Sequence, residues 1–286
     1  MKITLIGGDA RMCAVARLLQ KNGTAAVCGY GMAGGGARTG ETLYGALCGA
    51  EVLILPLPAS RDGVHPTAAK DVCLPTLSEI FSRAEDECLV LGGMLSPAVI
   101  AAAREADLEI ADYYSGEELL RKNAAATAEA AVGMAALELP VTLYGATVAI
   151  IGGGRIAFAL LSRLRALGAR VLLYARSPDA RRQAEAEGAV VFSLKEGEPP
   201  VFPPNVRAVF CTVPAMLFPN GCPLPPRGVP FYDLGGGAID PAWAGEGGIP
   251  LPPSAGLPGR YSPESAGGYL FAEIRKLLRM RRGVDI

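Results

Sequence analysis

The chain has 286 residues, half of them hydrophobic, so it is long and apolar enough to build two domains of ordinary size. Its formal net charge of −1 argues against binding to nucleic acid or to anionic membranes, which need a basic surface. No apolar run has the length of a membrane span, and the single histidine, His65, excludes a metal site built from several histidines.

The cysteines and the first residues both indicate a cytoplasmic protein. Seven cysteines are scattered along the sequence without a C-x-x-C pair, which is typical of reduced thiols in a cytoplasm. The apolar residues of a predicted strand follow almost directly after Met1, so we expect no signal peptide.

A strand, a turn and a helix open the chain. Residues 3–6 predict a strand, residues 7–11 (Gly-Gly-Asp-Ala-Arg) predict a turn, and a helix and a second strand starting at residues 25–27 follow. Asp9 and Arg11 lie just beyond the carboxyl end of the first strand, where open α/β sheets bind ligands, so both are candidates for a substrate cleft. The alternative is that Asp9 caps the helix and Arg11 is solvated.

The next strand is followed by a loop rich in chemical groups. Residues 30–49 are rich in glycine and predict irregular structure, and residues 52–55 predict a strand. The loop after this strand carries a hydroxyl, a guanidinium and the only imidazole, on Ser60, Arg61 and His65. Its place at a strand's carboxyl end makes it a candidate functional loop; the alternative is an ordinary loop with an exposed histidine. Further strands are predicted at residues 88–91 and 109–112.

A long helix rich in alanine is predicted over residues 117–139. Small side chains allow close packing, so we expect this helix to connect two domains. Asn123 and Thr127 are four residues apart and share a face. Glu129 lies off that face, and a carboxylate among apolar residues needs a partner, which makes it a functional candidate. The alternative is a glutamate that faces solvent.

The most informative motif lies within residues 147–177, where a strand, three glycines, a helix and a second strand follow one another. Gly152-x-Gly154-x-x-Ala157 fits the fingerprint of dinucleotide-binding turns. Gly152 permits the tight turn, Gly154 lets a pyrophosphate approach the backbone, and Ala157 lets the helix lie near the strand. The amides of the first helical turn then face the phosphates. The alternative is a glycine-rich turn without a ligand.

The second strand of this unit predicts which dinucleotide is bound. It ends at Tyr174-Ala175-Arg176-Ser177, without the acidic residue that holds the ribose 2′-hydroxyl of NAD. Arg176 can pair with a 2′-phosphate and Ser177 can donate to it, which favours NADP(H); the alternative is an ordinary surface arginine. Asp9 stands where this turn has Gly154, and its carboxylate would repel a pyrophosphate. We therefore assign the cofactor to the second unit.

The rest of the chain completes the second domain, with strands predicted at residues 189–192, 208–212 and 231–234. The segment Thr212-Val213-Pro214 ends one of these strands, and we expect it to approach the ribose and nicotinamide. The three glycines at 235–237 either open the backbone to a ligand or form a flexible loop.

A final helix is predicted to begin at Ser262 or Pro263. Its apolar residues are expected to return to the first domain; they are Leu270, Ile274, Leu277 and Leu278.

Together these elements predict an α/β fold with two doubly wound parallel sheets of Rossmann or flavodoxin-like type, joined by the long helix and the C-terminal helix. The predicted domains are a substrate and partner domain (1–118, completed by 262–286), a connecting helix (119–140) and an NADP-binding domain (141–261).

Several motifs together resemble the family of dipicolinate synthase A, one of the subunits of its enzyme, over nearly the whole chain. The most specific are the opening Ile6-Gly7-Gly8-Asp9-Ala10-Arg11 and the loop Ala255-Gly256-Leu257-Pro258-Gly259 before a Pro-x-Ser/Thr-Ala-Gly helix. The others are the Gly152 fingerprint with Arg155, Ala175-Arg176-Ser177, Thr212-Val213-Pro214-Ala215-Met216, Asp233-Leu234, and Asn123, Thr127 and Glu129, which match the family's N-x-x-x-T-x-E run. Ala126 and the three glycines at 235–237 depart from the family's pattern.

The resemblance implies a sporulation enzyme of the mother cell that oxidises dihydrodipicolinate, or its 4-hydroxy-tetrahydro hydrate, to dipicolinate with NADP. It also implies a flavoprotein-like partner, dipicolinate synthase B, and we expect an oligomer. Two substrate carboxylates call for cationic or hydroxyl partners, and a base must take the ring proton or help to expel water. The candidates are Glu129 and His65 for catalysis; Asp9, Arg11, Ser60, Arg61 and Thr127 for the substrate; and Gly152, Gly153, Gly154, Arg155, Ile156, Arg176, Ser177, Thr212, Val213 and Pro214 for the cofactor, with no metal ion.

Two other functions stay open. One is a related two-domain dehydrogenase for a 2-hydroxy acid, whose chemistry needs a histidine paired with a carboxylate and a substrate arginine; a single histidine in the first domain speaks against it. The other is a non-catalytic NADP-binding subunit of the same complex, because no side chain in the sequence is an unmistakable catalyst.

Overall fold

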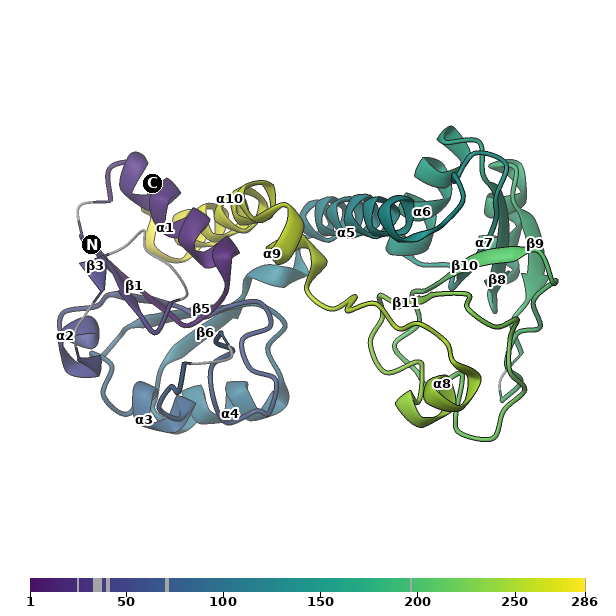
Figure 1. The fold of residues 1–286 in the computed structure, drawn as a ribbon. Helices are drawn as coiled ribbons and strands as arrows, with labels where there is room; N and C mark the ends of the chain where they lie inside the picture. Colours follow the sequence, from purple (N-terminus) through teal and green to yellow (C-terminus); the bar gives the residue numbers. More distant parts are fainter. Residues whose placement is uncertain (25, 33–37, 40–41, 70–71, 196, 286) are drawn as a thin grey trace. The chain divides into compact units, whose positions relative to one another are not determined.

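The computed structural model describes residues 1–24, 26–32, 38–39, 42–69, 72–195 and 197–285 (Figure 1). The chain divides into two compact units, the first formed by Met1–Asn123 with Gly259–Ile286 and the second by Ala124–Pro258. Within the described residues, no helix combines the length and the apolar character needed to cross a membrane.

The first unit is built on a six-stranded parallel sheet in the order β3-β2-β1-β4-β5-β6. Its apolar central strand pairs on both sides, since Ile3 lies opposite Val27 and also opposite Val52. The strand order therefore reverses between β1 and β4, which is the point where open α/β sheets bind ligands. The strands are β1 (Lys2–Ile6), β2 (Ala26–Tyr30), β3 (Arg38–Thr39), β4 (Val52–Ile54), β5 (Leu89–Gly92) and β6 (Glu109–Asp112).

Helices cover both faces of this sheet. On one face, α1 (Ala10–Lys21) and α10 (Pro263–Arg282) share a buried core with β1. On the other face, a second core is formed by α2 (Leu43–Leu47), α3 (Leu77–Phe81) and α4 (Pro97–Glu105). The short η1 (Tyr113–Ser115) follows β6, and α9 (Leu257–Tyr261) precedes α10.

The prediction of irregular structure over residues 30–49 is wrong for part of that segment. The structure has the short strand β3 and the helix α2 there, and the hydroxyl of Thr42 caps α2 by accepting a hydrogen bond from the Gly45 amide. Leu43 and Leu47 are buried, so burial of two leucines supports a helix that the glycine content concealed. Ala25, where the second strand was predicted to begin, lies outside the described residues.

Close packing of α10 on α1 depends on glycine. A Cβ at Gly267 would lie 2.5 Å from the Cβ of Ala14 and 2.7 Å from the carbonyl oxygen of Arg11. The next residue, Gly268, has no atom within 4 Å of the same position. The apolar side of α10 is buried in the first unit through Leu270, Phe271, Ile274 and Leu278, with Leu277 partly buried.

The second unit is built on a five-stranded parallel sheet in the order β11-β10-β7-β8-β9, and it too reverses direction, between β7 and β10. The strands are β7 (Thr147–Ile151), β8 (Arg170–Ala175), β9 (Val190–Ser193), β10 (Val206–Cys211) and β11 (Phe231–Asp233). The helices are α6 (Arg155–Ala166), α7 (Pro178–Ala186), α8 (Pro241–Gly247) and the part of α5 (Glu117–Glu138) from Ala124 onward.

The two faces of the second sheet have different cores. Aliphatic residues of β7 and α6 pack with the small side chains of α5, among them Ala128, Ala131 and Ala135. Aromatic side chains fill the other face, where Phe218 stacks on Trp243 and meets Phe231 edge-on. The predicted fold class of two doubly wound α/β sheets is thus confirmed.

The adjacent glycines of α10 provide a matched pair of variants. We expect Gly267→Ala to lower the free energy of unfolding by about 1–3 kcal/mol, because the new methyl group collides with α1. We expect Gly268→Ala to raise it by up to about 1 kcal/mol, since alanine favours a helix over glycine and meets no neighbour here. Urea unfolding of both variants measures the difference, and equal shifts would contradict the tight α1–α10 contact.

Candidate functional site

The turn between β7 and α6 is open at its last glycine. Gly152 has a φ of +123°, and a Cβ there would lie 2.1 Å from the Thr212 hydroxyl. A Cβ at Gly153 would lie 2.6 Å from the Cβ of Ala180, so this glycine lets α7 approach the turn. Gly154 is the N-cap of α6; it receives no side-chain cap, and a Cβ there would meet nothing within 4 Å. The turn therefore leaves room in front of the helix for a ligand group.

The matching turn of the first unit is filled by its own side chain. Asp9 caps α1 by accepting a hydrogen bond from the Arg11 amide (3.0 Å). The Arg11 guanidinium donates to both carboxylate oxygens of Asp9, at 2.9 and 2.8 Å, and to the carbonyl of Leu57 at 2.6 Å. Asp9 thus caps its helix, but Arg11 is buried rather than solvated. Both groups already have partners, and their role in substrate binding stays a prediction.

The strand ends next to β7 belong to the same edge of the second sheet. The amide and the hydroxyl of Thr212 both donate to the Ile151 carbonyl, at 2.8 and 2.9 Å, which ties the end of β10 to the end of β7. Val213, which is partly exposed, and Pro214, which is exposed, continue along this edge. The glycine loop that follows β11 is ordered by Asp233, which accepts hydrogen bonds from the amides of Gly236 and Ala238.

The end of β8 carries two arginines. Arg176 is exposed, and its guanidinium makes no hydrogen bond within the part of the chain that the structure describes. Ser177 caps α7 by accepting a hydrogen bond from the Ala180 amide (3.3 Å). Arg181 reaches back from α7 and donates to the carbonyls of Ala175 and Arg176. Sequence analysis missed Arg181, because its return to the strand end depends on how α7 lies on the sheet.

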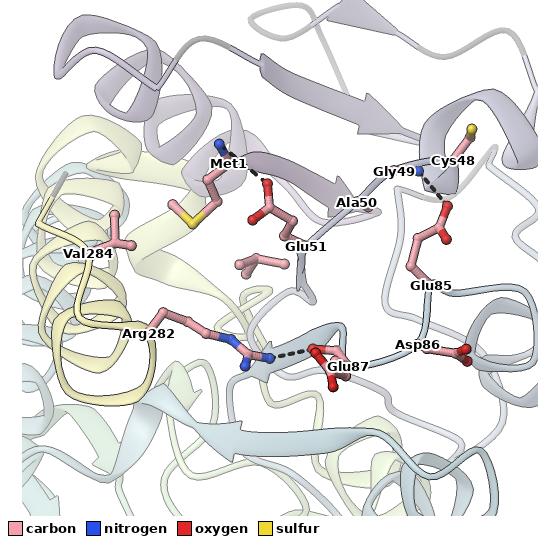
Figure 2. A pocket seen from close by; sticks show the side chains of 11 residues that line it. Met1, Cys48, Gly49, Ala50, Glu51, Glu85, Asp86, Glu87, Arg282 and Val284 are labelled. Carbon is pink, nitrogen blue, oxygen red and sulfur yellow. Dashed lines mark hydrogen bonds and ion pairs between the residues drawn. The ribbon is translucent and has the colours of Figure 1, made fainter.

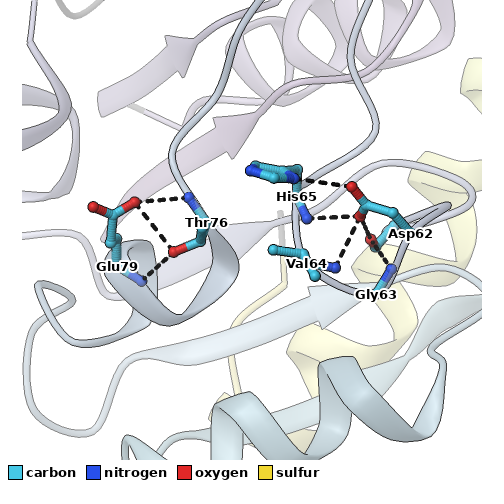
Figure 3. Close-up of polar contacts among 7 residues, drawn as sticks. Asp62, Gly63, Val64, His65, Thr76 and Glu79 are labelled. Atoms are coloured by element: carbon cyan, nitrogen blue, oxygen red, sulfur yellow. Dashed lines mark hydrogen bonds and ion pairs between the residues drawn. The ribbon is translucent and has the colours of Figure 1, made fainter.

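The loop after β4 holds the only histidine in a hydrogen-bonded pair with a carboxylate (Figure 3). The Nδ1 atom of His65 lies 2.9 Å from Oδ2 of Asp62. The other oxygen, Oδ1, accepts from the amides of Val64 and His65, both at 2.8 Å. These bonds, the His65 amide foremost, hold the pKa of the Asp62 carboxyl well below its usual range. Asp62 was missed, although an aspartate that starts a tight turn three residues before a histidine is a readable signal.

Two further side chains of this loop are placed differently. The buried Ser60 donates to Oδ1 of Asp62 (3.0 Å) and accepts from the Gly63 amide (2.9 Å), so it stiffens the turn. Arg61 is exposed, and no hydrogen bond or ion pair engages its guanidinium within the described ranges. The loop therefore presents an available cation beside an oriented imidazole ring.

The candidates on α5 have partners of their own. Glu129 is exposed and pairs with Arg163 of α6 at 2.7 Å, which agrees with the alternative of a glutamate facing solvent. Thr127 is buried in the second unit, whereas Asn123 belongs to the first and donates to the Tyr114 hydroxyl (2.8 Å).

A pocket of about 490 Å³ lies at the opposite edge of the first sheet, at the amino ends of β1 and β4 (Figure 2). Its acidic side chains are engaged: Glu51 pairs with the amino group of Met1 (3.3 Å), and Glu85 accepts from the Gly49 amide (2.6 Å). Open α/β sheets bind ligands at the carboxyl ends of their strands, so this pocket is not the candidate site. In the described part of the chain, no three His, Cys, Asp or Glu residues gather as a metal site would require.

Two family models match consecutive parts of the chain. Residues 2–114 match the N-terminal domain of dipicolinate synthase A. Residues 118–199 match the NAD-binding domain of D-isomer specific 2-hydroxyacid dehydrogenases. The second match covers the open glycine turn and the end of β8, and it supports a nicotinamide dinucleotide cofactor and an oxidoreductase.

Similar proteins cover almost the whole chain. Dipicolinate synthase A of Bacillus subtilis (strain 168) is 24% identical over 290 residues, which span 97% of this chain and 96% of that protein. The crystal structure of dipicolinate synthase A from Bacillus halodurans has a TM-score of 0.77 at 22% identity and covers 97% of both chains. The Bacillus subtilis structure has a TM-score of 0.76 at 24% identity, covering 99% of this chain and 97% of its own. The predicted resemblance to dipicolinate synthase A is thereby confirmed.

The contrast between Asp9 and Gly154 can be tested by moving the carboxylate. We expect Gly154→Asp to weaken binding of the dinucleotide about 100-fold or more, because the new carboxylate takes the position of a phosphate at the start of α6. The fold should survive, since a Cβ here meets no neighbour. Gly154→Asn is the control with the same volume and no charge. Calorimetric titration compares them, and equal affinities would contradict an anion site at this turn.

Proposed function

We propose that this chain oxidises dihydrodipicolinate, or its 4-hydroxy-tetrahydro hydrate, to dipicolinate with NADP, in the cytoplasm of the mother cell of a sporulating bacterium. The observation that carries the proposal is the uncapped glycine turn between β7 and α6, in a chain whose other such turn is filled by Asp9. The similarity to dipicolinate synthase A along 97% of the chain supports the substrate.

The choice of NADP rests on the end of β8. An NAD site places a carboxylate there to bind the ribose 2′-hydroxyl, and this chain has the exposed Arg176 instead. A guanidinium matches a phosphate in charge and in geometry, so the extra phosphate of NADP finds a partner that NAD lacks. When bound, the nicotinamide would accept the hydride that leaves the substrate ring.

The substrate is a ring with two carboxylates, and the loop after β4 offers groups that suit it. Arg61 is an available cation, in contrast to Arg11, whose guanidinium is committed to Asp9 and to the Leu57 carbonyl. We therefore assign a substrate carboxylate to Arg61 in preference to Arg11. Oxidation removes one hydride and one proton from dihydrodipicolinate; the hydrate loses water as well.

The proton needs an acceptor, and His65 suits this role better than Glu129. In the neutral ring, Nδ1–H donates to Asp62 and leaves the lone pair of Nε2 available. The ring is about half exposed, so a substrate can reach it. Glu129 is held by Arg163, and that charge pair makes its carboxylate a weaker base.

A partner belongs to the proposal. The similar proteins are named as one subunit of a synthase, so we propose that this chain works with a second protein, dipicolinate synthase B, for which the sequence resemblance implies a flavoprotein-like fold.

A second function is favoured by one observation. A 2-hydroxy acid dehydrogenase needs a histidine oriented by a carboxylate and an arginine for the substrate, and the loop after β4 carries His65, Asp62 and Arg61 together. The match of residues 118–199 to the 2-hydroxyacid dehydrogenase domain agrees with this alternative.

Turnover separates the two functions. The purified chain is mixed with NADP and either freshly prepared dihydrodipicolinate or a panel of 2-hydroxy acids, each with and without dipicolinate synthase B, and NADPH absorbance is followed. We expect NADPH to form with the dipicolinate precursor only. Formation with a 2-hydroxy acid would support the alternative, and no NADPH under any condition would contradict both.

Substitution of the two candidate bases gives opposite expectations. We expect His65→Gln to lower kcat about 100- to 10,000-fold, which is the usual contribution of a positioned acid–base group. Glu129→Gln removes only an exposed ion pair, so kcat should change by less than about threefold. Steady-state kinetics measures both, and a large loss in Glu129→Gln with a normal rate in His65→Gln would transfer the role to Glu129.

A further inference from the structure

We propose that Arg181 is a second anchor for the 2′-phosphate of the cofactor, acting beside Arg176 at the carboxyl end of β8. The inference rests on the proposed use of NADP and adds to it a residue that lies outside the strand-end motif. Its basis is the position in which the structure holds the Arg181 side chain.

The guanidinium of Arg181 is fixed at the strand end. Its Nη1 atom donates to the carbonyl of Ala175 at 2.7 Å and to the carbonyl of Arg176 at 2.8 Å, and it lies 3.4 Å from the Ser193 hydroxyl at the end of β9. The side chain is partly buried, unlike the exposed Arg176. A cation that is already held in place loses little conformational freedom when an anion binds.

These contacts leave donors for a ligand. A guanidinium has five N–H groups in a planar fork, and the contacts to the strand end all use Nη1. The hydrogen atoms on Nε and Nη2 have no acceptor within the part of the chain that the structure describes. Ser177 uses its oxygen as an acceptor for the Ala180 amide, so its hydroxyl hydrogen can also be donated.

The charge balance at this strand end favours a dianion. The carboxylate in the first turn of α7 is Asp179, and it forms an ion pair with Arg182. Arg182 and Asp179 are both strongly exposed, at 71% and 83%. The neighbouring arginines of α7 therefore have different roles: Arg182 offsets Asp179, whereas Arg181 turns back to the strand end and adds its charge to that of Arg176.

The simpler alternative is that Arg181 only fastens α7 to β8 through the two carbonyls. A fastening role needs an N–H donor but no charge, whereas binding a phosphate needs the charge. Arg181→Gln separates the two, because the glutamine amide can still donate to a carbonyl. Arg182→Gln is the matched control, since it removes the same charge from the next residue of the same helix.

The experiment measures the adenosine end of the cofactor alone. The full chain and its variants are titrated by calorimetry with adenosine 2′,5′-bisphosphate and with adenosine 5′-monophosphate. We expect Arg181→Gln to weaken binding of the bisphosphate about 10- to 100-fold, which matches the loss of one or two charge-assisted hydrogen bonds. Binding of the monophosphate should stay within about twofold. Arg182→Gln should preserve the preference, and Arg181→Lys should keep most of it.

The outcomes are distinct. If the original chain prefers the bisphosphate and Arg181→Gln keeps this preference, or weakens both ligands equally, Arg181 only fastens the helix and the inference is overturned while the use of NADP stands. If the original chain binds both ligands equally well, the proposed use of NADP fails, and the inference fails with it. Loss of the preference in Arg181→Gln but not in Arg182→Gln supports the inference.

Discussion

The amino-terminal amides of the first helix after each central strand must be satisfied, and the group that satisfies them decides what each unit can bind. In the first unit the group is the carboxylate of Asp9, so the turn is closed from within. In the second unit the N-cap is Gly154, which has no side chain to offer, so the position remains for an external anion. One architecture thus serves two purposes, and a single carboxylate makes the difference.

The closed turn also organises the first unit. Because Asp9 is charged and partly buried, it needs the guanidinium of Arg11, which in turn reaches the carbonyl of Leu57 at the start of the loop after β4. A Cβ at Gly259 would lie 2.5 Å from Asp9, so a glycine there lets the segment that leads into α10 lie against this pair. The most specific motifs of the sequence, around Asp9 and around Gly259, therefore meet at one point of the fold.

Sequence patterns predicted what depends on local order. Apolar runs indicated the strands of both sheets, and the spacing of Gly152, Gly154 and Ala157 indicated the open turn. The short helices α2, α3 and α4 were missed, because each buries only a few residues and becomes stable through packing on the sheet. Asp62 was within reach, since its contact with His65 spans three residues, whereas the contacts of Arg181 depend on the tertiary placement of α7.

The pair of Asp62 and His65 is local in the same sense, which limits what can disturb it. The carboxylate is exposed, so burial does not maintain its charge; the hydrogen bonds of its own turn do. A carboxyl with a lowered pKa stabilises the turn at every pH above its usual value, and this support is lost only as the pH falls through the lowered value. Asp62 therefore remains an acceptor for Nδ1–H throughout the neutral range. Protonation that ends the basic role of the pair must occur on the imidazole ring, the one group of this kind in the chain.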